Sequence, residues 1–125
     1  MTVHLDTSAL IDALTGPRRS LAALAALAEE GHRLALSTVV LYEWLRGPRT
    51  RAELSAQEEL FPRDRSIVFG ATEADLAARL YTRMRHPRGR EIDLAIAACA
   101  LAAGATLWTL NRSAFEDVPD LRLIT

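Results

Sequence analysis

The sequence has no lysine, a single cysteine and three histidines, and these shortages remove several kinds of chemistry. One cysteine allows no internal disulfide and no cysteine-based zinc site, and Cys99 lies in an apolar run that predicts a core position. His4, His32 and His86 share no metal-binding spacing, which argues against a zinc hydrolase. Metal-dependent chemistry in this chain would therefore depend on its carboxylates.

The chain also lacks a strong net charge and a long apolar run. Its formal charge of −1 and its pI near 6.3 produce no global positive field, so a polyanion would need a local basic patch. The N-terminal MTVHLD lacks the features of a signal peptide, and no apolar stretch reaches the length of a membrane span. We expect one soluble, cytoplasmic domain over residues 1–125, without membrane contact.

Short apolar runs alternate with helical patterns along the chain. Because the connections are too long for hairpins, this alternation predicts an α/β fold whose mostly parallel sheet is covered on both faces. Thr7 or Ser8 is expected to cap the first helix, T-E-A-D at 72–75 predicts a capping box, and an apolar stripe runs from Leu21 to Ala28. The expected strands are 3–5, 33–37, 66–69, 106–109 and 122–124, and the expected helices are 7–12, 18–32, 38–46, 51–60, 72–85 and 91–103.

Three carboxylates, those of Asp6, Glu43 and Asp93, lie in aliphatic segments that lead into helices or form them. An acidic side chain in such a segment loses its water on folding, which is unfavourable unless a cation or hydrogen-bond donors replace that water. Asp6 and Asn111 directly follow strands, at the sheet edge where ligands of α/β proteins bind. Oxygen-only ligands suit Mg²⁺ or Mn²⁺, so the three carboxylates predict a divalent-cation site.

Each of these residues also has a simpler interpretation. Asp6 is well placed to cap a helix, and Asp93 is favourable in the first turn of a helix without any metal. Glu43 can pair with Arg46 at i+3 on a solvated helix face. Asn111 can simply start a turn after its strand.

One basic cluster precedes Asp93 in the sequence. It spans the end of helix 72–85 and the following loop, beside the expected site, where the phosphates of a nucleic acid would need positive charge. A run of charges is more often a solvated face, and Trp44 and Trp108 are expected to pack in the core and not against bases. The cluster comprises Arg79, Arg83, Arg85, Arg88 and Arg90.

Three ordered motifs connect the candidate residues: LDTSALI around Asp6, STVVLYEWLRG around Glu43, and IDLAIAACALAAGATLWTLNRSAF from Ile92 to Phe115. In these motifs the chain resembles the PIN domain family and, within it, the VapC-type toxins of bacterial toxin-antitoxin pairs. The resemblance implies a three-layer α/β/α fold, a homodimer and a Mg²⁺-dependent ribonuclease acting on RNA. It also implies an antitoxin partner, whose basic tail occupies the active cleft.

The resemblance and the placement together assign roles. Asp6 and Asp93 would ligate the ion, and Glu43 would complete the ligand set or take the proton from the attacking water. Neighbouring polar groups would hold the carboxylates by hydrogen bonds, and arginines would position the RNA backbone. The polar groups belong to Thr7, Ser8, Thr109 and Asn111, and the arginines are Arg83, Arg85, Arg88 and Arg90.

One position departs from the family pattern. Where T-x-N-x-x-D-F is usual, this chain keeps the threonine, asparagine and phenylalanine but has Ala114 in place of the acid. If a helical turn continues there, Asp117 shares a face with position 114 and is a candidate fourth acid. Three carboxylates hold one metal ion more readily than two metal ions, so we expect one tightly bound ion.

Two other interpretations remain open. A PIN-like domain without that acid could be a regulatory module that binds RNA or a partner protein and cleaves nothing. A phosphatase could use Asp6 as its nucleophile, although the chain has no lysine for the role that such enzymes give one.

Overall fold

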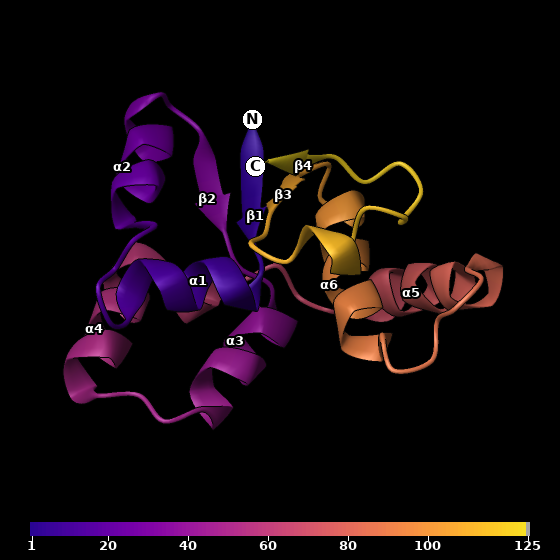
Figure 1. Cartoon of the computed structure of the whole chain (residues 1–125), viewed down its shortest axis with the longest axis horizontal. Helices are drawn as coiled ribbons and strands as arrows, with labels where there is room; N and C mark the ends of the chain where they lie inside the picture. Colours follow the sequence, from indigo (N-terminus) through magenta and orange to yellow (C-terminus); the bar gives the residue numbers. More distant parts are fainter. Residues whose placement is uncertain (125) are drawn as a thin grey trace.

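The computed structural model describes residues 1–124, and within them four parallel strands form one sheet (Figure 1). The strands are β1 (Thr2–Leu5), β2 (Arg33–Ala35), β3 (Thr106–Trp108) and β4 (Leu123–Ile124), in the order β2-β1-β3-β4. The central strand β1 pairs on both sides, with Val3 opposite Leu34 and also opposite Thr106. The prediction of a mostly parallel sheet is therefore confirmed.

Six α-helices within the same residues surround this sheet: α1 (Thr7–Leu14), α2 (Leu21–Glu29), α3 (Thr38–Arg46), α4 (Arg51–Leu60), α5 (Ala71–Arg83) and α6 (Glu91–Ala102). Two short 3-10 helices, η1 (Arg63–Arg65) and η2 (Arg112–Ala114), complete the order. Helix α5 packs along α6, and α1 packs against α3 (Figure 1). Through residue 124, no helix combines the length and the apolar character needed to cross a membrane.

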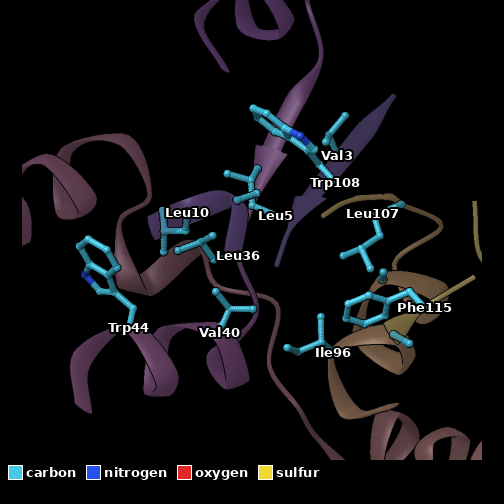
Figure 2. Packing of buried hydrophobic residues seen from close by; sticks show 14 of the residues in the cluster. Val3, Leu5, Leu10, Leu36, Val40, Trp44, Ile96, Leu107, Trp108 and Phe115 are labelled. Atoms are coloured by element: carbon cyan, nitrogen blue, oxygen red, sulfur yellow. The ribbon is translucent and has the colours of Figure 1, made fainter. Parts of the chain in front are cut away.

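Both faces of the sheet carry core side chains. Neighbouring residues of a strand point to opposite faces, so Leu107 and Trp108 lie on different sides of β3. Both are buried, and Figure 2 shows Leu107 near Phe115, with Trp108 beside Val3. Helices thus cover the sheet on both sides, which confirms the three-layer α/β/α expectation.

Helix α6 forms the middle of one layer. Its residues from Leu94 to Ala100 are all buried, which explains why this segment is apolar on every side. Cys99 is fully buried within it, and burial raises the pKa of its thiol to about 11, so it is a core residue as predicted. Trp44 and Trp108 are also buried, which confirms their packing role.

The predicted strand at 66–69 is wrong. Only one parallel bridge forms there, between Ser37 and Ile67. The Ile67 N–H donates to the Leu36 carbonyl at 2.8 Å, and the Thr38 N–H donates to the Ile67 carbonyl at 2.9 Å. The segment that pairs with Ile67 turns into helix α3 at Thr38. The hydrogen-bonded pairing therefore has no extended residues with which to continue.

Two helix details also differ from expectation. Gly70, and not Thr72, caps α5, because the Glu73 carboxylate accepts the Gly70 N–H at 3.0 Å. In α2 only Leu24 is buried and the alanines of the predicted stripe are exposed. Helix α2 packs only at the margin of the fold, against α1 and β2, so a narrow row of leucines is enough to attach it.

Candidate active site at the carboxyl edge of the sheet

Asp6 lies where β1 ends and α1 begins, and its side chain is almost completely buried, with 4% of the residue exposed. Its Oδ1 accepts hydrogen bonds from Ser8 Oγ at 2.7 Å and from the Ala9 N–H at 2.9 Å. Its Oδ2 accepts from Thr109 Oγ1. Asp6 is therefore the cap of α1, instead of Thr7 or Ser8, and Ser8 and Thr109 hold the carboxylate as predicted.

The segment after β3, residues 109–111, lies against Asp6 and the start of α1. Thr109 is buried, and its Oγ1 accepts the Asn111 N–H at 2.9 Å. The Leu110 N–H donates to Ser8 Oγ at 3.0 Å, which joins this segment to the start of α1. Among residues 1–124, the Asn111 side chain accepts from Ser113 and bonds to no carboxylate, so Asn111 supports the site through its backbone.

Glu43 approaches the same region from α3. Thr7 Oγ1 donates to Glu43 Oε1, so Thr7 holds Glu43 and not Asp6. Arg46 Nη2 lies 3.4 Å from Glu43 Oε2, as the solvated i+3 interpretation expected. The Glu43 side chain is nevertheless only 17% exposed, because α3 packs against α1. Within residues 1–124, Glu43 Oε2 has only this long contact with Arg46 and stays available for chemistry.

Asp93 completes the set from the first turn of α6. Burial raises the pKa of its half-buried carboxyl, and the negative charges of Glu43 and Asp6 raise it further. Asp93 is therefore within electrostatic reach of both Glu43 and Asp6. As arranged through residue 124, however, no three acidic, histidine or cysteine side chains meet closely enough to hold one ion. To ligate one ion together, the three side chains would have to come closer to one another.

The donor set fits a hard dication. All three groups are carboxylates, which Mg²⁺ and Mn²⁺ prefer, and a cation between them would relieve the repulsion. The oxygens of Asp6 are already oriented by three hydrogen bonds: Oδ1 accepts two of them, and Oδ2 accepts one and retains a lone pair for a further contact. The requirement for a metal stays a prediction.

The basic cluster divides into anchored and exposed members. Arg79 pairs with Asp75 on α5, and Arg90 pairs with Asp117. The other arginines, Arg83, Arg85 and Arg88, are exposed. A shallow cavity of about 460 Å³ lies at the end of α5, and it is lined by Tyr81, Arg85, His86, Pro87 and Arg88.

Tyr81 and His86 were absent from the residues predicted for the site. The signal for Tyr81 was a half-exposed aromatic position in the last turns of an amphipathic helix, beside a run of arginines.

The candidate fourth acid is already engaged. Both oxygens of Asp117 accept from the Arg90 guanidinium, at 2.7 and 2.9 Å, and this pairing lowers the pKa of Asp117. Ala114 ends η2, and its carbonyl accepts from Arg90 Nη2 at 2.8 Å. Each Asp117 oxygen accepts one of these hydrogen bonds and keeps a second lone pair, so the fourth-acid role of Asp117 stays a prediction.

This parallel α/β domain, with three coupled carboxylates at the carboxyl edge of its sheet, has the arrangement expected of a PIN domain. Residues 3–121 match the PIN domain family, and the chain belongs to that family. Ribonuclease VapC19 of Mycobacterium tuberculosis is 34% identical over 123 residues, which cover 94% of this chain and 95% of the relative. Within the family, the chain belongs to the VapC-type ribonuclease toxins of toxin-antitoxin pairs.

Solved structures agree with this assignment. VapBC2 from Rickettsia felis, bound to a DNA fragment from its promoter, matches with a TM-score of 0.77 at 25% identity, over 99% of this chain and 98% of that chain. DNA-bound VapBC from Salmonella typhimurium gives a TM-score of 0.76 at 22% identity, over 99% and 97% of the two chains. The second match supports the fold alone.

Proposed function

We propose that this chain cleaves RNA phosphodiesters with Mg²⁺ held by Asp6, Asp93 and Glu43, and that Mn²⁺ can replace Mg²⁺. The observation that carries the proposal is the placement of the three carboxylates in a VapC-type chain: Asp6 caps α1, Glu43 lies on α3 and Asp93 in the first turn of α6, where it is coupled electrostatically to the other two. When bound, the dication would activate a water molecule for in-line attack on the phosphodiester.

The protein groups around that position have separate tasks. Asp6 is fixed by Ser8, Ala9 and Thr109. Thr7 holds one oxygen of Glu43, which leaves the other to bind the ion or to accept the proton of the attacking water. The arginines of the neighbouring cluster, Arg83, Arg85, Arg88 and Arg90, would contact the RNA backbone.

The purified chain, freed of any partner, is expected to cleave single-stranded RNA with Mg²⁺ or Mn²⁺ and to stop when EDTA is added. The reason is that EDTA removes the dication from its carboxylate ligands, and the reaction then lacks the ion that it needs. Gel analysis of a labelled RNA checks this, with restoration by excess Mg²⁺ as the control. Full activity in EDTA would remove the metal from the mechanism.

RNA binding without cleavage under those conditions would favour the regulatory module. The ion pair between Asp117 and Arg90 is the observation in favour of that alternative. It engages the candidate fourth acid, so three carboxylates without such a pair are left for the ion. The phosphatase interpretation has no support from the family match.

Mg²⁺ is expected to raise the melting temperature of the chain by several degrees. An ion that binds only the folded state stabilises it, and here it also relieves repulsion among carboxylates. The measurement is a thermal melt with and without Mg²⁺, on the wild type and on Asp93→Asn. An equal shift in both proteins would show that the ion binds elsewhere.

A protein partner is part of the proposal. The matched structure from Rickettsia felis is a VapBC assembly, so we propose a cognate antitoxin for this chain. The resemblance to the VapC-type toxins adds the proposal of a homodimeric toxin. A cluster of carboxylates attracts a basic tail, and an arginine of that tail can take the place of the cation.

The copurified complex is expected to be inactive on RNA and to dissociate more readily at high salt, because the contact is largely between charges. Activity assays and gel filtration across a salt series check this. A complex that cleaves RNA as fast as the free chain would contradict the blocking role and leave the nuclease proposal intact.

A further inference from the structure

Arg90 is held unusually firmly for an arginine near the surface. Its guanidinium donates to both oxygens of Asp117 and to the carbonyl of Ala114. Its side chain is 19% exposed, whereas those of Arg46, Arg63 and Arg79, which also form ion pairs, are 56%, 63% and 68% exposed. Arg90 has therefore lost most of its conformational freedom on folding.

These contacts do not use all of its donors. A guanidinium has five N–H groups, and the contacts to Asp117 and Ala114 take three of them. The Nε–H and one Nη1–H have no partner among residues 1–124. A charged group with unused donors and a fixed position is prepared to bind an anion.

Arg90 also lies next to Asp93, one of the three carboxylates. It precedes α6 as its cap residue, and its carbonyl accepts the Leu94 N–H at 2.9 Å, so Arg90 and Asp93 belong to the same first turn. The two side chains attract each other electrostatically. The residue that carries the free donors is thus within one helical turn of a proposed ligand of the ion.

We propose that Arg90 binds the RNA phosphate at the acid cluster, and that Asp117 is the residue that positions it. This inference rests on the proposed function and gives Asp117 a different task from that of a fourth acid. Because the guanidinium is ordered before RNA arrives, binding does not have to freeze a flexible arginine side chain. Asp117 offsets part of the charge, and water screens this pair because the Asp117 side chain is 56% exposed.

The test compares three variants: Arg90→Gln, Asp117→Asn and Arg63→Gln. The first two break the same ion pair, but only Arg90→Gln removes the phosphate donor. Arg63→Gln is the matched control, because it breaks an exposed arginine–carboxylate pair, with Glu58, that belongs neither to the basic cluster nor to the acid site. Fluorescence anisotropy with a labelled single-stranded RNA oligonucleotide, in EDTA to prevent cleavage, gives the affinity, and thermal melts show that each variant folds.

Arg90→Gln is expected to weaken RNA binding about tenfold and to flatten its salt dependence by about one unit of slope, whereas Asp117→Asn weakens it about threefold. Arg63→Gln leaves the RNA affinity unchanged. In the Arg90→Gln background, Asp117→Asn should have no further effect on RNA affinity, because Asp117 acts only through Arg90.

If the pair merely ties α6 to the segment after β3, Arg90→Gln and Asp117→Asn will lower stability equally and change RNA affinity equally, which would overturn the inference. A wild type that cleaves RNA, together with an Arg90→Gln variant that binds RNA normally, would also overturn it and leave the proposed function intact. A wild type that never cleaves, but shows the expected order of affinities, would reject the proposed reaction and support this role of Arg90.

Discussion

Asp93→Asn is expected to lower the rate of RNA cleavage by at least about 10³-fold, and Asp6→Asn should do the same. Each change replaces a charged ligand by a neutral amide, which binds a hard dication more weakly. The loss should appear in the chemical step, because the arginines that contact RNA remain in place. Single-turnover cleavage of a labelled RNA at saturating Mg²⁺ measures it.

Glu91→Gln is the matched control for Asp93→Asn. Glu91 lies in the same first turn of α6, but it is exposed and accepts only the Gly89 N–H, at 3.2 Å. It should keep nearly full activity. If Asp93→Asn remained active, the Asp93 carboxylate would not be needed for cleavage. If Glu91→Gln lost as much activity as Asp93→Asn, the helix turn as a whole and not the Asp93 carboxylate would be responsible for the loss.

Most of the fold could be predicted because its signals are local. Helices α3 and α4 begin and end at the predicted residues, since polar caps and Gly47-Pro48 mark their limits. The segment 66–69 shows where local signals fail. It is apolar and extended, but a strand also needs a partner, and its partner becomes a helix at Thr38.

The candidate site was predicted at the level of residues and less well at the level of contacts. Asp6 and Asp93 were recognisable because each charge interrupts an aliphatic segment. That Thr7 holds Glu43 could not be predicted, because the contact depends on how α1 packs against α3.

The pairing of Asp117 with Arg90 could not be predicted for a related reason. The i+3 argument placed Asp117 on the same side as position 114, and Arg90, 27 residues earlier, contacts both the Ala114 carbonyl and the Asp117 carboxylate. The fourth-acid role of Asp117 stays a prediction. The metal-binding roles of the three acids remain predictions, because a sequence reports which residues are present and not where their oxygens turn when an ion arrives.

Asp6→Ala is expected to destabilise the metal-free chain by about 3 kcal/mol, while Asp6→Asn changes its stability by less than about 1 kcal/mol. Alanine removes the cap of α1 and leaves the Ala9 N–H and the Thr109 hydroxyl without their acceptor in a buried position. Asparagine keeps an oxygen for the Ala9 N–H and also reduces the repulsion with Asp93. Urea unfolding in EDTA measures the two values.

Asp93→Ala is the comparison that separates the structural role of a buried acid from its role in the reaction. Among residues 1–124 the Asp93 side chain accepts no hydrogen bond, so its removal should leave the metal-free chain at least as stable as the wild type. Equal stability losses for Asp6→Ala and Asp93→Ala would contradict the capping role of Asp6. If Asp6→Asn instead lost cleavage while keeping its stability, the negative charge at position 6 would be needed for the reaction. The side-chain oxygen that asparagine retains would be what the fold needs.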